Sequence, residues 1–331
     1  MDWVPLPPPI NPLVAVRRTT SEVMARAKHV SVNVGAVEQL AKMWAMDGGQ
    51  GGASVGWNES GWHYSEDAAA GGNLTCQYVF VLDCLNFCFW PTPGLEYEHL
   101  AFGLKAAVQR DPLVLSADRL ASANENTIRG WFSGFEIPQI SERASKLREL
   151  GCVLQAHFGG EAANLVARAA RSTARLVRLL TCLLPGFRDE ALHRGQQCFF
   201  YKRAQILAAD LWAAYGRPPP GSPSPYAFED VGDLTMFADY RVPQILAHLG
   251  VIEYSAALEV TIGAGVELPA GSEEEVEIRA ACIQAVERLR NALTRRQVGV
   301  TSVEIDWRLW HEGERIKKDI RPHHRTLTCF Y

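Results

Sequence analysis

The residues of this sequence best suited to chemistry are carboxylates set among apolar neighbours. Asp239 lies in the stretch "LTMFADYRVPQILAHLG", shortly before a proline typical of a helix start, with Phe237 and Tyr240 beside it. Burying an ionised carboxylate is costly unless the group is paired or hydrogen-bonded. Asp239 is therefore either a helix cap among core aromatics or a group that the helix dipole holds ionised for chemistry. The residues alone leave both interpretations open.

A second carboxylate lies in "VEIDWRLWHEG", residues 303–313. On a helix, Asp306 and Trp310 are four residues apart, as are Trp307 and His311, so an acid, two aromatic rings and an imidazole share one broad face. Such a face can line a binding site. The alternative is an aromatic core stripe that ends in a solvated histidine.

A third group occurs in "YKRAQILAAD", where Lys202 and Arg203 begin a predicted helix that carries Asp210 two turns later. Arg203 and Asp210 can lie on one side of this helix, and Lys202 can reach an anionic ligand. Solvated charges at a helix start are the competing explanation.

Weaker candidates lie towards the N-terminus. Asp83 and Asn86 stand between apolar residues in "LDCLNFCFW", where buried polar groups more often serve as structural hydrogen-bonding partners. The glycine-rich stretch "GWHYSED" places His63 in a loop, from which it can close over a site.

Motifs and composition exclude several classes of protein. The sequence has no GxSxG, Walker, dinucleotide-binding or HExxH motif, and its eight cysteines form no CxxC pair or zinc-type spacing. We therefore expect no metal and no cofactor. The net charge of −4 argues against a nucleic-acid polymer as partner. The absence of a signal sequence or of a run of roughly 18 apolar residues predicts a soluble cytoplasmic protein without membrane contact.

Helical signals dominate the elements that must position these residues. Residues 1–12 are rich in proline and predict a flexible arm, and residues 13–331 predict a single helical domain. Helices are expected near residues 20–46, 161–184, 198–215 and 243–249, and from Ser272, whose spacing to Glu275 is that of a capping box. The apolar run before Pro91 fits a buried strand or a short buried helix equally well. The expected fold is mainly α, with little or no β-sheet.

Five blocks of the sequence resemble the queuosine salvage protein family, the queuosine 5′-phosphate N-glycosylase/hydrolases. They are "FVLDCLNFCFW", "FYKRAQILAADLW", "LTMFADYRVPQILAHLG", "EVEIR" and "PHHRTLTCFY", in the family's order. The resemblance implies hydrolysis of queuosine 5′-monophosphate to queuine and ribose 5-phosphate, which supplies queuine for tRNA modification. It also implies a fold similar to the helical DNA glycosylases, a small-molecule substrate and a monomer.

By position in the matching blocks, the resemblance gives roles to the candidate residues. Asp306 is expected to be the nucleophile or transition-state stabiliser, with Asp239 as its catalytic partner and as the ligand of the amine and hydroxyls of the queuine side ring. Phe237 is expected to stack on the base and Lys202 to bind the 5′-phosphate. The other residues expected to line the pocket are His63, Trp307 and His311.

Two positions depart from the family pattern, because His311 stands where an acidic residue is expected and Trp307 where a tyrosine is expected. Three alternatives stay open at this point. They are a non-catalytic queuine or nucleotide carrier, a DNA or RNA glycosylase, and a glycosylase that acts on another modified nucleotide.

Overall fold

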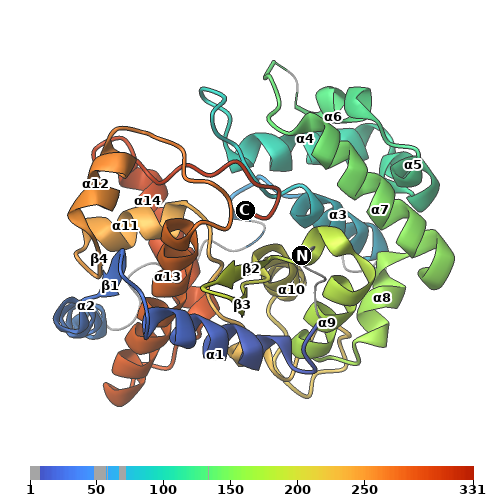
Figure 1. Cartoon of the computed structure of the whole chain (residues 1–331). Coiled ribbons are helices and arrows are strands. Elements are labelled where there is room, and N and C mark those ends of the chain that lie inside the picture. The colour runs from blue at the N-terminus through green and yellow to red at the C-terminus, as the bar shows by residue number, and fades with distance from the viewer. Residues whose placement is uncertain (1–7, 48–56, 58, 67–71, 133) are drawn as a thin grey trace.

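The computed structural model describes residues 8–47, 57, 59–66, 72–132 and 134–331. Within these ranges the chain is mainly helical, as the sequence predicts (Figure 1). The helices are α1 (Pro12–Met24), α2 (Val34–Met46), α3 (Asn73–Cys84), α4 (Tyr97–Arg110), α5 (Ala117–Ala121), α6 (Glu125–Trp131), α7 (Ile140–Phe158), α8 (Ala162–Arg168), α9 (Thr173–Leu183), α10 (Lys202–Ala214), α11 (Arg241–His248), α12 (Ala256–Gly263), α13 (Glu273–Arg295) and α14 (Ser302–Ile316). Short 3₁₀ turns occur at Pro112–Leu115, Pro185–Phe187 and Val231–Asp233.

The described strands form two small antiparallel pairs. Strand β1 (Val30–Val32) pairs with β4 (Ile252–Tyr254), and β2 (Glu190–His193) pairs with β3 (Gln196–Phe199). The first pair ties the N-terminal part of the chain to the segment that follows α11. The second is a hairpin directly before α10, so it fixes where that helix begins.

Two helices form the centre of the core. Helix α13 packs against α1, α2, α11 and α14, and α3 packs against α4, α7, α8 and α10. Nearly every residue of α3 is buried, including polar Gln77 and Asp83. A helix that is apolar on all sides must be enclosed by others, and this explains why the run before Pro91 shows no clear period. The open choice between strand and helix is thus settled for the helix over Asn73–Cys84.

The helix predicted over residues 20–46 is wrong, because the structure divides it into α1 and α2. Glu277 on α13 accepts hydrogen bonds from the backbone amides of Lys28, His29 and Val30, which draws them out of a helical conformation. Asn33 then caps α2 by accepting from the amide of Ala36. These tertiary partners, distant in sequence, override the local helical pattern.

The helix predicted over residues 161–184 is also two helices, α8 and α9. Ala170 and Arg171 between them have positive φ values of 48° and 58°, and Ser172 caps α9. Asp230 accepts from the amide of Thr173 at 2.5 Å, so a distant loop supplies a second cap. Helix α10 begins at Lys202 rather than near residue 198, because β3 extends to Phe199 and Tyr201 has a positive φ of 52°.

Helix ends agree better with the sequence. Ser272 caps α13 and accepts from the amide of Glu275, as the spacing predicts. Asn11 caps α1, so Pro12, the last residue of the predicted arm, is already helical, while residues 1–7 lie outside the described part of the chain.

The single-domain organisation stays a prediction. In the described ranges, no helix combines the length and apolar character that crossing a membrane requires.

Candidate active site

One cavity of about 1080 Å³, measured with its open mouth, brings together the residues singled out in the sequence. Its wall includes all seven predicted site residues, namely His63, Lys202, Phe237, Asp239, Asp306, Trp307 and His311. They come from a loop, from α10, from the segment before α11 and from α14. Residues more than 240 positions apart in the sequence thus line one site.

Helix α10 lines the cavity with a single stripe of residues. Lys202, Ile206, Asp210, Ala213 and, just beyond the helix, Arg217 follow one another at intervals of three or four residues, and all five are in the wall. That spacing places the four helical residues on one face. From Lys202 to Ala213 the stripe spans about 17 Å at the helical rise, which is long enough to run beside a mononucleotide.

Asp239 is both a cap and a wall residue of the cavity. Its Oδ1 accepts hydrogen bonds from the amides of Arg241 at 2.9 Å and Val242 at 3.0 Å, the first residues of α11. Burial raises the pKa of Asp239, whereas Lys202 and these amides lower it. The two interpretations left open by the sequence are therefore one arrangement.

Asp306 lies on α14 near this cap, and only 4% of its surface is exposed. Its Oδ1 accepts the amide hydrogen of Phe237 at 3.0 Å, so the segment that carries Asp239 also fixes Asp306. Burial and then the charge of Asp239 raise the pKa of Asp306 well above its ordinary value. The two carboxylates are close enough to repel each other, and a cation between them would relieve that repulsion.

Lys202 is the ammonium group among these acids. Its Nζ donates to the backbone oxygen of Asn86 at 3.1 Å. Burial lowers the pKa of Lys202, and Asp239, Asp83 and Asp306 raise it. Its side chain therefore balances part of the negative charge at this end of the cavity.

His63 is held in the cavity wall by two rings. Its ring stacks on Trp57 with centroids 3.8 Å apart, and its Nε2 lies 2.8 Å from the hydroxyl of Tyr97. Burial lowers the pKa of His63 to about 4, so this imidazole is neutral at physiological pH.

The part of the wall formed by α14 is aromatic. Trp307 stacks with Trp212 at 6.4 Å, and the guanidinium of Arg217 lies 5.0 Å from the Trp307 ring. His311 contacts the edge of Trp310, and burial lowers its pKa. Flat apolar walls of this kind suit a planar heterocycle.

Arg203 does not share the cavity with its sequence neighbour Lys202. Its guanidinium donates to the backbone oxygens of Cys84 and Gly186 and lies over the rings of Phe87 and Phe187. Although Arg203 and Asp210 were expected to share one side of the helix, Arg203 takes no part in the cavity, because backbone carbonyls from other elements bind its guanidinium. Asp210 lines the cavity without it.

Several residues of the cavity wall were not predicted from the sequence. Tyr97 begins α4, and Glu96, Arg241 and Glu314 form a charged part of the wall in which Arg241 donates to Glu314 at 2.5 Å. Neither periodicity nor a motif marks Tyr97 or Glu96. Arg241 had a signal, since it directly follows the Asp239 block at the start of a helix.

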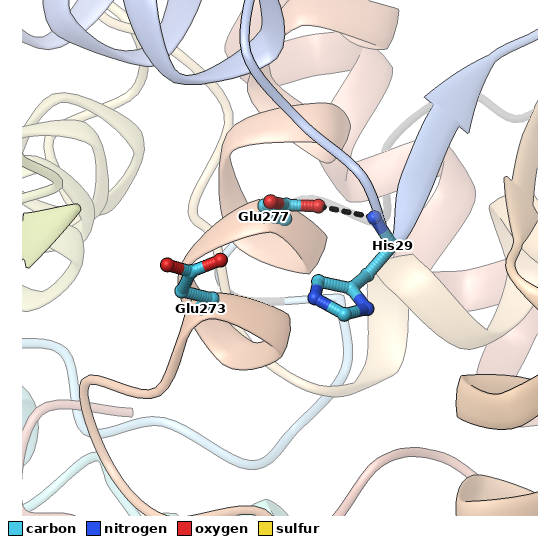
Figure 2. Close-up of side chains that lie close together, drawn as sticks. All are labelled: His29, Glu273 and Glu277. Carbon is cyan, nitrogen blue, oxygen red and sulfur yellow. Dashed lines mark hydrogen bonds between the residues drawn. The ribbon is translucent and has the colours of Figure 1, made fainter. Parts of the chain in front are cut away.

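A histidine and two glutamates elsewhere in the structure have the spacing of a metal site. The ligand atoms of His29, Glu273 and Glu277 lie within 4.8 Å of one another, and Figure 2 shows Glu277 hydrogen-bonded to the backbone nitrogen of His29. Both glutamates already have protein partners, because Glu273 pairs with Arg194 and Glu277 with His193. These contacts describe a structural cluster that joins α13 to β1 and β2.

Comparison with known proteins gives consistent results. Residues 63–331 match the family model described as queuosine salvage protein. A Dictyostelium discoideum protein named queuosine 5′-phosphate N-glycosylase/hydrolase is 42% identical over 327 residues, which cover 97% of this chain and 100% of that protein. Proteins of the same name from Sphaerobacter thermophilus and Mus musculus are 41% and 31% identical, covering 96% and 98% of this chain and 98% and 99% of their own lengths.

Proposed function

Since the chain belongs to the queuosine salvage protein family, we propose that it hydrolyses the N-glycosidic bond of queuosine 5′-phosphate and releases queuine and ribose 5-phosphate. The observation that carries this proposal is the pair formed by half-buried Asp239 and buried Asp306 in the wall of one cavity. Released queuine would then serve tRNA modification. A monomeric state and a cytoplasmic location stay predictions.

The charge of the cavity fits the substrate. Queuine carries a secondary amine that is cationic at neutral pH, and Asp239 and Asp306 are carboxylates that burial and mutual repulsion make costly to ionise together. A bound ammonium group offsets that repulsion, so binding stabilises both anions. We assign the amine to Asp239, and the base to the space beside Phe237 and Trp307.

The role that we assign to Asp306 follows from the charge that develops during cleavage. As the C1′–N bond lengthens, positive charge builds on the ribose ring, and a nearby carboxylate stabilises that charge or forms a covalent intermediate with it. Asp306 suits this role because the Phe237 amide fixes its Oδ1, while no hydrogen bond from the described chain reaches its Oδ2. His63 and His311 then act as uncharged walls around the base and the side ring.

The role of Lys202 as a ligand of the 5′-phosphate stays a proposal. Its contacts with Asn86 and its carboxylate neighbours support a second role, that of counter-ion to the catalytic acids. The two roles predict different losses for phosphorylated and unphosphorylated substrates.

The proposal is tested by incubating the purified protein with queuosine 5′-phosphate and measuring free queuine by chromatography. We expect steady release that saturates with substrate. A carrier that only binds the nucleotide would show heat on titration but no free base, and this outcome would refute the enzymatic proposal.

The assignment of Asp239 is tested with the variant Asp239→Ala. We expect a higher KM, because the variant loses the partner of the substrate amine. The control is a substrate analogue whose base lacks the amine-bearing side ring, for which the variant and the parent should have similar KM values. Equal effects on both substrates would return Asp239 to a purely structural cap.

A further inference from the structure

Asp210 is a buried carboxyl group of the cavity that takes no part in the steps assigned to Asp239 and Asp306. It lies on the wall stripe of α10 between Ile206 and Ala213, with 6% of its surface exposed. Lys202 stands two turns earlier on the same face. Its position places Asp210 beside the space available to a ligand.

The wall acids differ in the hydrogen bonds that they accept. Asp239 accepts hydrogen bonds from two backbone amides, and Asp306 accepts one from a single amide. No hydrogen bond from the described residues reaches the carboxyl group of Asp210. Hydrogen bonds from N–H groups stabilise the ionised form of a carboxyl group. Asp210 therefore has the least support as an anion among the three.

Charged neighbours act in the same direction. Burial, and then the charges of Asp83 on α3 and Asp306 on α14, raise the pKa of Asp210 well above its ordinary value, against the single opposing charge of Lys202. The phenols of Tyr78 on α3 and Tyr97 on α4 also lie within range of its charge. This setting favours the protonated form of the carboxyl group, which can act as a proton donor.

The departing base needs such a donor. Breaking the C1′–N bond leaves the electron pair on the pyrrole-type nitrogen of the deazaguanine, whose ring lacks the basic nitrogen that a purine offers for protonation. His63 is neutral and held against Tyr97, and Lys202 donates to Asn86. Asp83 is enclosed and lies outside the cavity wall.

We propose, building on the function assigned above, that Asp210 is the general acid that protonates the departing base while Asp306 faces the sugar. The C1′–N bond breaks with its electron pair moving to the base, and the proton of Asp210 goes to the base. The oxygen of a water molecule bonds to C1′, and its proton goes to Asp306. Queuine and ribose 5-phosphate leave, and solvent exchange restores the proton on Asp210 and removes the one on Asp306.

The test compares two leaving groups in the variants Asp210→Asn and Asp306→Asn. One substrate is queuosine 5′-phosphate, and the other is 4-nitrophenyl ribofuranoside 5-phosphate, whose nitrophenolate leaves without a proton. Removing a general acid lowers kcat by roughly 10²- to 10⁴-fold, so we expect that loss for Asp210→Asn on the natural substrate and a far smaller one on the nitrophenyl substrate. Asp306→Asn, the matched control, should lose activity on both, and Asp210→Glu should recover part of the rate.

Wild-type protein provides an independent measurement that needs no variant. We expect kcat for queuosine 5′-phosphate to fall at high pH as the donor loses its proton, and the nitrophenyl substrate to lack this decline. An equal loss on both substrates in Asp210→Asn, a change in KM alone, or identical high-pH profiles would overturn the role of Asp210. Failure of the wild-type protein to release queuine would instead overturn the proposed function.

Discussion

Two groups of acidic side chains meet at Lys202, and they differ in how their charges are balanced. On one side, both oxygens of Asp189 accept from Arg279, at 2.8 and 2.6 Å, and one also accepts from the Lys202 amide. On the other side, the acids around the Lys202 ammonium group have few partners. They are Asp83, which lies outside the cavity wall, and Asp210, Asp239 and Asp306, which line it.

This difference separates support from chemistry. A buried pair with good geometry and matched charges holds elements together, whereas acids in excess of their cations store repulsion that a ligand can relieve. The two groups are also connected. Nε of Arg279 donates to the backbone oxygen of Ala238, at 3.0 Å, between the two predicted substrate-binding residues Phe237 and Asp239. The balanced group therefore positions the unbalanced one.

The balanced group should be the more important for stability. Replacing Arg279 with methionine leaves Asp189 buried without its partner, and breaking such a pair costs about 3–5 kcal/mol. We expect the free energy of unfolding, measured in urea, to fall by this amount. The matched control is Arg18→Met, which removes an exposed pair with Glu22 and should change stability by less than about 0.5 kcal/mol. Similar small losses in both variants would remove the distinction between the two groups.

The unbalanced group should show the opposite pattern. We expect Asp306→Asn to lower kcat by about 10³-fold, the size of effect found when a preorganised electrostatic group is lost. Its free energy of unfolding should stay level or rise, since the change removes a carboxyl group whose pKa burial and Asp239 raise. Single-turnover kinetics and urea unfolding measure both quantities. A variant that turns over normally while still binding substrate would refute the assignment of Asp306.

Asp83 allows the cost of burying an acid of this group to be measured by pH. Burial raises the pKa of Asp83 to about 7, from its ordinary value near 4 in the unfolded chain, and its Oδ2 has no hydrogen-bond partner in the described structure. The folded state then binds more protons than the unfolded state between these values, so the contribution of Asp83 to stability falls as pH rises from about 4 to 7.

The variant Asp83→Asn should lack that decline. Relative to the wild type, we expect it to gain on the order of 2 kcal/mol of stability between pH 5 and pH 8. Urea unfolding of both proteins at the two pH values measures this gain. A cost of the new amide that is the same at both pH values cancels in the comparison. Parallel stability profiles for the two proteins would show that Asp83 is not held neutral by burial.

The same contrast explains what the sequence can predict. Local signals were sufficient for many helix ends, such as Ser272 at the start of α13. They failed between α1 and α2, where Glu277, almost 250 residues later, binds the amides that a helix would use. A break made by a distant side chain leaves no mark in the local pattern.

For the site, an acid in an apolar block was a usable signal, and the family resemblance added roles that spacing cannot supply. Asp239 and Asp306 were found in this way and line one cavity. The separation of Arg203 from Asp210 was not predictable, because Arg203 binds carbonyl groups of α3 and of the turn at Gly186. Tyr97 was missed since its role depends on a loop histidine 34 residues earlier.

The smallest expected effect concerns Lys202, which belongs to both groups through its amide and its ammonium. If the ammonium balances the cavity acids, as its contacts favour, Lys202→Met should lower kcat/KM for queuosine 5′-phosphate and for unphosphorylated queuosine by the same factor, about 10-fold for a loss near 1.4 kcal/mol. A ligand of the 5′-phosphate would instead lose activity on the phosphorylated substrate alone. Comparing the two ratios for Lys202→Met and wild-type protein separates these roles, because the missing phosphate removes one interaction and leaves the cavity acids unchanged.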